Sequence, residues 1–268
     1  MNNRIIDLFA RKREHILNIY CTAGYPGLHD ISDIIVELDK AGVDLVEIGM
    51  PYSDPIADGP TIQMSNGIAL ANGISLEGLF EQLSDIRAKT QVPLILMGYI
   101  NPVLQYGLEK FCRDAQAVGI DGVILPDLPL REYEMMYASL FEECNLSHVF
   151  LITPQTSQER IRKIDELTKG FIYMVSSDST TGKTHQLSEN QIAYFKRIVD
   201  MSLKNPRLIG FGISDHQSFS QACTYSQGAI IGSAFIKAIE GKSGEELKTS
   251  ISRFVASILN AHSIPANS

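Results

Sequence analysis

The stretch VEIGMPYSDPIADGPTIQ, residues 46–63, carries a strand, a loop and the start of a helix in direct succession. It begins with an apolar run in which Glu47 stands among aliphatic residues, and it continues as a loop that holds Asp54 and Asp58 but no basic residue. Pro60 suits the first turn of a helix, because proline lacks the backbone N–H that this turn leaves unpaired. We therefore interpret the stretch as one strand–loop–helix unit with acids at the end of its strand and in the loop that follows.

The same unit recurs along the chain. Runs rich in Val, Ile, Leu and Tyr alternate with helical patterns, and most of these runs are continuously apolar, as is typical of parallel strands covered on both faces. Eight runs predict strands, at 16–23, 43–49, 93–99, 121–126, 148–154, 170–176, 207–212 and 228–233. Apolar stripes and capping residues predict helices at 31–42, 108–119, 157–170, 192–203 and 246–262.

The number of units indicates the fold. Eight strand–helix units in about 250 residues are the count of an α/β protein with a (β/α)8 TIM barrel. A doubly wound parallel sheet with extra strands is the alternative. Because no linker, low-complexity segment or charge block interrupts the alternation, we predict a single barrel domain over residues 1–268. The opening segment MNNRIIDLFARKRE (1–14) is expected to form an extra N-terminal helix that closes the bottom of the barrel.

The composition limits the possible classes of protein. With 268 residues, 44% of them hydrophobic, the chain can bury a large core. A net charge of −8 argues against nucleic acid or an anionic membrane as the main partner. The N-terminus has charges where a signal peptide needs an apolar run, and no stretch reaches the roughly 18 apolar residues that span a bilayer. The four cysteines and six histidines lack metal or redox spacing, so we expect a reduced, cytoplasmic protein without a metal site.

Strand alternation gives Glu47 a direction. In VDLVEIG (43–49), Val43, Leu45 and Glu47 share one face, because side chains alternate along a strand. If that face points into the barrel, Glu47 lies near the C-terminal mouth, where barrel enzymes carry out their chemistry. Apolar neighbours would raise the pKa of its carboxyl toward neutrality and let it exchange a proton near pH 7. The structural alternative is a glutamate that pairs with a buried arginine or caps a loop.

Asp58 has two interpretations of its own. It lies in the turn sequence Ala-Asp-Gly-Pro, where an aspartate often caps the following helix. The functional alternative is an anion on an active-site loop, held against a substrate cation or N–H group.

Two strand ends suit a phosphate group. GFGIS (210–214) and IIGSAF (230–235) end the seventh and eighth runs, and the loops there bind phosphate in many barrels. Gly212 and Gly232 allow a close backbone approach, and Ser233 offers an N–H and a hydroxyl group. The structural alternatives are a turn for Gly212, strand-end packing for Gly232 and a helix cap for Ser233.

Other kinds of chemistry can be excluded from the sequence. The polar loop at 175–190 is typical of a lid, and it contains Gly-Lys-Thr, but Ser177 stands where a Walker A motif needs glycine. None of the eight strand runs contains the lysine of a Schiff-base aldolase, and no histidine cluster suits a metal aldolase. Acid–base chemistry by carboxyl groups on a phosphorylated substrate remains.

At this point the sequence resembles the tryptophan synthase alpha chain family over nearly its whole length. The most specific match is VEIGMPYSDPIADGPTIQ, and GFGIS, IIGSAF, MGYINPVLQYG (97–107) and PDLP (126–129) match as well. The resemblance implies cleavage of indole-3-glycerol phosphate to indole and glyceraldehyde 3-phosphate, in the last stage of L-tryptophan biosynthesis.

The resemblance also implies roles for single residues. Glu47 would be the general acid/base that protonates the indole ring at C3 and helps to remove the proton of the side-chain hydroxyl, and Asp58 would accept the ring N–H. The other implied positions bind the phosphate or line the indole pocket and lid: Gly182, Gly212, Gly232, Ser233, Tyr20, Ile62, Tyr173 and Thr181.

The lid departs from the family pattern. Where the family often has Ser-Arg-Ala-Gly-Val-Thr-Gly, this chain has SSDSTTG at 176–182. The arginine is lost, Asp178 enters and a glycine becomes Ser179. We expect the change to affect lid closure and signalling between chains, and not the reaction.

A partner is implied as well. The family works with a tryptophan synthase beta chain that carries pyridoxal phosphate and receives indole through an internal tunnel, in an alpha2beta2 heterotetramer, while the alpha chain holds no cofactor. Loop 52–60, with Asp54, and Asn-Pro-Val at 101–103 fall on the docking face. Two alternatives stay open: a stand-alone indole-producing lyase of the same fold, and a chain that mainly binds and activates a partner.

Overall fold

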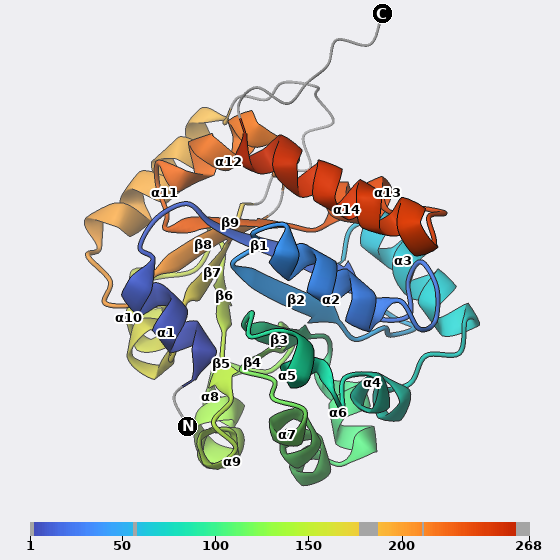
Figure 1. Ribbon diagram of the computed structural model, residues 1–268. Helices are drawn as coiled ribbons and strands as arrows, with labels where there is room; N and C mark the ends of the chain where they lie inside the picture. The colour runs from blue at the N-terminus through green and yellow to red at the C-terminus, as the bar shows by residue number, and fades with distance from the viewer. Residues whose placement is uncertain (1–2, 56–57, 177–186, 211, 261–268) are drawn as a thin grey trace, which may run out of the picture.

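The computed structural model describes residues 3–55, 58–176, 187–210 and 212–260 (Figure 1). In this part of the chain nine parallel strands form one sheet, in the order β5-β4-β3-β2-β1-β9-β8-β7-β6. The strands are β1 (Ile16–Thr22), β2 (Leu45–Gly49), β3 (Leu94–Met97), β4 (Gly122–Ile124), β5 (Ser147–His148), β6 (Phe150–Ile152), β7 (Ile172–Val175), β8 (Arg207–Gly210) and β9 (Gly228–Ile231).

The sheet closes on itself through one run of sequence. Strands β5 and β6 stand at opposite ends of the sheet order, yet only Val149 separates them in the chain. They are the two halves of the run predicted at 148–154, where the chain changes its partner from β4 to β7. The prediction of a (β/α)8 barrel is therefore confirmed and the doubly wound alternative is wrong. The division into a single domain over residues 1–268 stays a prediction.

Helices surround the closed sheet (Figure 1). Each predicted helix is present, and α11 begins earlier than expected because Ser188 caps it in a capping box with Gln191. The helices that match predictions are α1 (Arg4–Arg11), α2 (Ile31–Lys40), α7 (Leu108–Ala117), α10 (Gln158–Leu167), α11 (Glu189–Asp200) and α14 (Gly244–Leu259). The others are α3 (Pro60–Ala71), α4 (Leu76–Gln82), α5 (Ile86–Lys89), α6 (Ile100–Tyr106), α8 (Leu130–Glu132), the π-helix η1 (Tyr133–Tyr137), α9 (Ala138–Glu143), α12 (His216–Cys223) and α13 (Ser233–Ala238).

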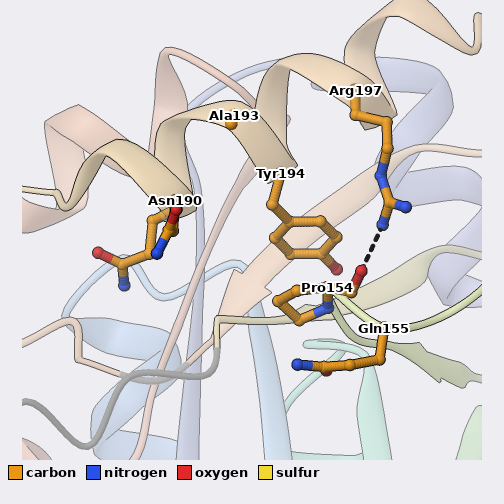
Figure 2. Close-up of a pocket in the computed structure, with 7 residues that line it drawn as sticks. Pro154, Gln155, Asn190, Ala193, Tyr194 and Arg197 are labelled. Atoms are coloured by element: carbon orange, nitrogen blue, oxygen red, sulfur yellow. Dashed lines mark hydrogen bonds between the residues drawn. The ribbon is translucent and has the colours of Figure 1, made fainter.

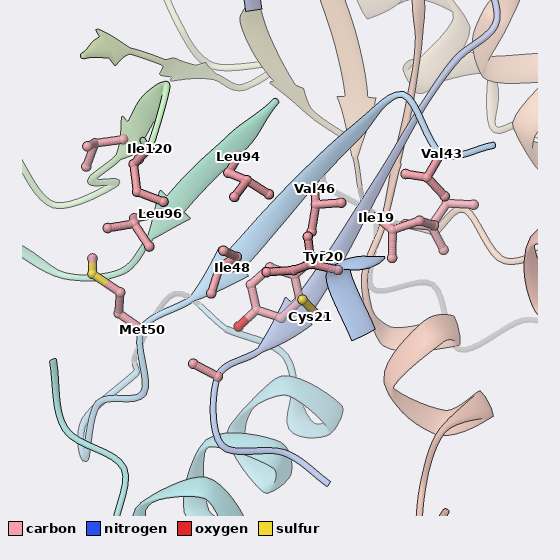
Figure 3. Packing of buried hydrophobic residues seen from close by; sticks show 14 of the residues in the cluster. Ile19, Tyr20, Cys21, Val43, Val46, Ile48, Met50, Leu94, Leu96 and Ile120 are labelled. Carbon is pink, nitrogen blue, oxygen red and sulfur yellow. The ribbon is translucent and has the colours of Figure 1, made fainter. Parts of the chain in front are cut away.

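Alternation along the strands separates two buried apolar clusters. The outer cluster lies between the sheet and the helices, and Figure 3 shows part of it on β1, β2 and β3, including Ile19, Val46 and Leu96. The inner cluster fills the barrel, and its strand residues include Ile16, Leu45, Ile95, Ile124, Leu208 and Ile230. The inward face predicted for Leu45 is confirmed, whereas Val43 packs in the outer cluster because β2 begins only at Leu45.

Helix α1 seals one end of the barrel. Its Ile5 and Leu8 are fully buried in the inner cluster, so the helix covers the end where the strands begin, as predicted. Asn3 caps the helix by accepting a hydrogen bond from the N–H of Ile5 at 3.0 Å, and its amide donates to the carbonyl of Asp121 at 2.7 Å. The cap therefore joins the helix to the sheet.

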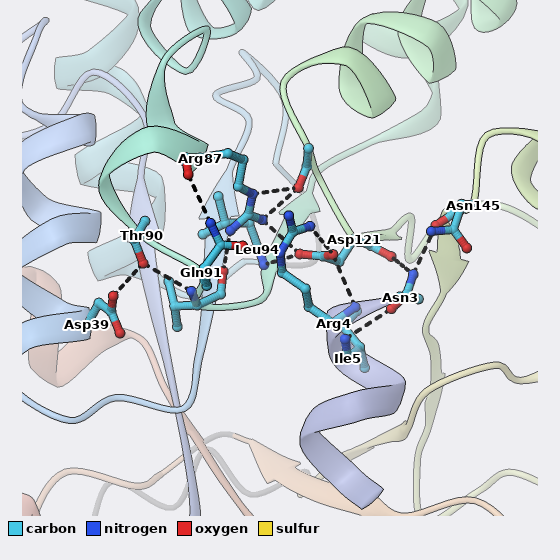
Figure 4. A network of polar contacts seen from close by, with 12 residues as sticks. Asn3, Arg4, Ile5, Asp39, Arg87, Thr90, Gln91, Leu94, Asp121 and Asn145 are labelled. Carbon is cyan, nitrogen blue, oxygen red and sulfur yellow. Dashed lines mark hydrogen bonds and ion pairs between the residues drawn. The ribbon is translucent and has the colours of Figure 1, made fainter. Parts of the chain in front are cut away.

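A buried carboxylate fixes this closed end (Figure 4). Asp121 immediately precedes β4 and accepts hydrogen bonds from the guanidinium groups of Arg4 at 3.0 Å and Arg87 at 2.8 Å. Its Oδ2 also accepts from the backbone N–H of Leu94 at 3.0 Å. Because buried charges are tolerated only when paired and hydrogen-bonded, these contacts hold α1, α5 and the start of β3 together. The opposite end of the barrel is left open for a site.

Candidate active site

A cavity of about 370 Å³ lies at the C-terminal mouth of the barrel. Residues from β1, β2, β3, β7, β9 and α3 line it, together with Asp58 before α3 and the segments that follow β8 and β9. Thr181 and Gly182 lie outside the described residues. The other eight residues singled out from the sequence all line this one cavity: Tyr20, Glu47, Asp58, Ile62, Tyr173, Gly212, Gly232 and Ser233.

Glu47 is completely buried on β2, with its side chain at the inner end of this cavity. Its Oε1 accepts a hydrogen bond of 2.5 Å from the side-chain amide of Asn18 on β1. No described residue brings a basic group or a hydrogen bond to Oε2, so the alternative of a buried arginine partner is wrong. Burial raises the pKa of the Glu47 carboxyl to about 8, against the opposing effect of the Asn18 amide.

Asp58 approaches the cavity from the loop before α3. The N-cap of α3 is Gly59 and no side chain caps it, so the alternative of Asp58 as a helix cap is wrong. Its Oδ2 instead accepts a hydrogen bond from the Tyr99 hydroxyl at 3.3 Å. Burial raises the pKa of Asp58 to about 6, and the Tyr99 hydrogen bond acts in the opposite direction. At neutral pH Glu47 is therefore mostly protonated and Asp58 mostly ionised.

Two glycines belong to the lining of the cavity. Gly212 has φ of 76°, a left-handed conformation that favours glycine. It therefore forms a turn, as the structural alternative expected, and it also lines the cavity. A Cβ added to Gly232 would lie 3.5 Å from Cβ of Tyr20 and 3.7 Å from Cδ1 of Ile62. These are ordinary contact distances, so packing allows a side chain there, and glycine instead leaves space between two cavity-lining residues.

Helix α13 begins at the cavity. Its N-cap is Gly232, so Ser233 is the first helical residue and not the cap that the structural alternative expected. Backbone N–H groups in a first helical turn have no partner within the helix, which makes them available to an anion. Of the described residues that line the cavity, Lys237 alone is basic.

Sequence reasoning missed Asn18 and Lys237, although both left a signal. Asn18 is a polar residue within an apolar run, two positions before Tyr20 and therefore on the same strand face. Lys237 follows Ser233 by one helical turn and shares its face of α13.

The two tyrosines of the cavity remain neutral. Burial raises the pKa of both phenols, Tyr20 and Tyr173, well above the ordinary value. The Tyr20 ring fills the space beside Gly49, and the Tyr173 ring fills the space beside Gly210, where an added Cβ would overlap each ring. Both rings therefore act as walls and not as proton acceptors.

A second cavity, of about 440 Å³, lies between Pro154 and α11 (Figure 2). The Arg197 guanidinium donates to the carbonyl of Pro154 at 2.9 Å, and the Tyr194 hydroxyl donates to the carbonyl of Ile152 at 3.0 Å. No carboxyl group belongs to its described lining. The cavity at the barrel mouth, which contains both Glu47 and Asp58, is therefore the candidate active site. The described ranges contain no group of three or more His, Cys, Asp or Glu suited to a metal ion, and no helix in them is long and apolar enough to cross a membrane.

Known proteins match the chain over most of its length. A family model described as "Tryptophan synthase alpha chain" matches residues 7–262. The tryptophan synthase alpha chain of Christiangramia forsetii is 58% identical over 224 residues, which cover 84% of this chain and 88% of that protein. That of Flavobacterium psychrophilum is 56% identical over 243 residues, 91% of this chain and 94% of that one. In the crystal structure of the tryptophan synthase complex from Pyrococcus furiosus, a chain 31% identical superimposes with a TM-score of 0.83 and covers 92% of this chain and 99% of its own length.

Proposed function

Because the chain belongs to the tryptophan synthase alpha chain family, we propose that Glu47 and Asp58 are the two carboxyl groups with which it cleaves indole-3-glycerol phosphate to indole and glyceraldehyde 3-phosphate. The observation that carries this assignment is their place in one cavity at the barrel mouth, with pKa values near 8 and 6. Two carboxyl groups with pKa values moved apart can serve as an acid and as an anion at the same pH.

The reaction then follows from these protonation states. Protonated Glu47 donates its proton to C3 of the indole ring, which makes the ring cationic. The Asp58 carboxylate accepts the ring N–H and stabilises that cation. The Glu47 carboxylate next removes the proton of the hydroxyl on the carbon attached to C3. The carbon–carbon bond breaks, its electron pair returns to the ring, the carbon that carried the hydroxyl becomes the aldehyde, and Glu47 is protonated again.

Different residues of the cavity lining are assigned to the two parts of the substrate. Tyr20, Ile62 and Tyr173 line it and are proposed to hold the indole ring. Gly212, Gly232 and Ser233 are proposed to hold the phosphate through backbone N–H groups and the serine hydroxyl, with Lys237 as the countercharge. The implied lid residue Thr181 and the implied phosphate-binding residue Gly182 stay predictions because they lie outside the described residues.

A beta chain is the proposed partner, in an alpha2beta2 heterotetramer, and the pyridoxal phosphate of the second reaction would belong to it and not to this chain. The two expected docking segments lie together here, because the Asn101 amide donates to the Tyr52 hydroxyl at 3.3 Å and the rings of Tyr52 and Tyr99 are 5.3 Å apart. Leu104 on the same helix as Asn101 is 49% exposed. Tyr52 and Asp58 are six positions apart in the sequence, which links the proposed docking face to the proposed active site. A cytoplasmic location is part of the same proposal.

Removal of the acid tests the catalytic assignment. Glu47→Gln keeps the size and most packing of the side chain but cannot supply or take the proton, so we expect kcat for indole release to fall at least ~100-fold. Affinity for indole-3-glycerol phosphate, measured by calorimetry, should change little, and Asp58→Asn should also lower kcat. A Glu47→Gln variant with nearly full activity would refute the assignment.

Removal of the cation tests the phosphate end. Lys237→Met should raise KM for indole-3-glycerol phosphate by roughly 3- to 10-fold with kcat nearly unchanged, because a lost charge contact weakens ground state and transition state alike. Added salt should raise the KM of the native chain more than that of the variant. Lys196→Met, at an exposed lysine on α11, is the matched control. Equal KM values in both variants would exclude Lys237 from the site.

Addition of a beta chain tests the partner. Indole release by this chain should rise strongly when a beta chain is added, and Leu104→Lys should remove the rise without affecting the activity of the chain alone. Val199→Lys, at an apolar residue of α11 that is 42% exposed, is the control. Full turnover without a rise would instead favour a stand-alone lyase, and a rise in the partner's activity without any turnover here would favour a binding subunit.

A further inference from the structure

Asn18 lies on β1, the strand next to the proposed acid, one inward position further from the barrel mouth. It sits in the middle of β1, is completely buried, and pairs in register with Leu45 of β2. Its side chain therefore reaches along the sheet toward the mouth to donate its amide N–H to Oε1 of Glu47 at 2.5 Å. Asn18 is not among the described residues that line the cavity, so it can act on the substrate only through Glu47.

An amide at this position has a cost that an apolar residue would avoid. Among the described residues, neither Oδ1 of Asn18 nor Oε2 of Glu47 has a hydrogen-bond partner. A buried polar atom without a partner destabilises the fold, and the inner-cluster residues in register with Asn18, Leu45 and Ile230, are aliphatic. The interaction that offsets this cost is the one with Glu47.

Since Glu47 is the proposed acid/base, we propose that Asn18 is a positioning residue that holds its carboxyl group in both protonation states. The amide N–H donates to the carboxylate, as observed. When the acidic proton is on Oε2, Oε1 is the carbonyl oxygen of the neutral acid and accepts the same N–H, so the hydrogen bond persists in both states. A lysine or arginine would hold the carboxyl group as an anion, and a leucine would donate a hydrogen bond to neither form.

This placement suits a group that loses and regains its proton in every turnover. With Oε1 held by Asn18, Oε2 has no partner among the described residues and is the oxygen left to exchange a proton with the substrate. The carboxyl then keeps one orientation through both proton transfers, and reaction geometry is sensitive to shifts of an ångström or less.

The other ionisable groups near Glu47 do not titrate in the same pH range, so their effect on activity can be distinguished from that of Glu47. Burial raises the pKa of Tyr20, Tyr173 and Cys21, so these groups stay neutral across the range where Glu47 titrates. Cys21 only donates its thiol to the backbone carbonyl of Glu47. Among the described residues that line the cavity, Asp58, with a pKa of about 6, is the other acid and Lys237 is the base.

The test is the pH profile of kcat in Asn18 variants. Native activity should fall below about pH 6, where Asp58 gains a proton, and above about pH 8, where Glu47 loses its own. The Asn18 donor favours ionised Glu47, so Asn18→Leu should raise the pKa of Glu47 and move the basic limb upward by roughly one pH unit. The maximum kcat should fall about 10-fold or more through lost positioning, with KM unchanged. Asn18→Asp, which is nearly isosteric, should move the basic limb further through like-charge repulsion.

Ile95→Val is the control, because Ile95 pairs in register with Glu47 and belongs to the inner cluster but carries no polar group. It should leave the pH profile in place. If Asn18→Leu does not fold, Asn18→Ala removes the same hydrogen-bond donor without adding a charge and supplies the same reading. An unshifted basic limb in the Asn18 variants, with Glu47→Gln inactive, would overturn the role of Asn18 alone. An active Glu47→Gln would overturn the assignment of Glu47 and this inference with it.

Discussion

Burial of one carboxyl group without a basic partner shapes the whole site. Water would keep the Glu47 carboxyl ionised at neutral pH, whereas the apolar barrel interior favours its neutral form. Its only hydrogen-bond donor among the described residues is the uncharged amide of Asn18. A basic partner would have returned the pKa to its ordinary range and removed the proton that the chemistry needs. The partly exposed Asp58 meets a weaker form of the same effect and keeps its charge.

This arrangement reduces the stability of the fold. Because the folded-state pKa of Glu47, about 8, lies above its ordinary value of 4.5, the unfolded chain releases this proton first as the pH rises. The free energy of unfolding therefore decreases as the pH rises from about 4.5 to about 8. The opposite end of the barrel compensates with interactions that have no part in the reaction: Ile5 and Leu8 fill the barrel floor, and Asp121 joins two arginines to the sheet. This stability allows the strand ends at the mouth to hold destabilising groups such as the buried carboxyl of Glu47.

The periodicity of the sequence predicted the strands and the faces they turn inward, which depend on one segment at a time. It did not predict features that depend on contacts between segments. Eight apolar runs gave the barrel, and the period of two placed Leu45 and Glu47 inside, since both follow from local geometry. The break at Val149 depends on where the closing sheet changes partner, which no single run encodes. Asn18 and Lys237 were missed because their roles depend on contacts between segments. Asn18 donates to Glu47 on the neighbouring strand, and Lys237 lines a cavity built from several elements. Asp58 was ambiguous because a cap and a site anion have the same local sequence, and only the position of Gly59 as the cap separates them.

A direct titration of Glu47 tests this account without any assumption about substrate. The carboxyl carbon can be followed by 13C NMR in protein labelled at glutamate, with Glu47→Gln to assign the resonance. The structure predicts a midpoint near pH 8 in the chain without substrate. A midpoint near the ordinary 4.5 would mean that water or a cation reaches this carboxyl group, and would contradict its role as the acid.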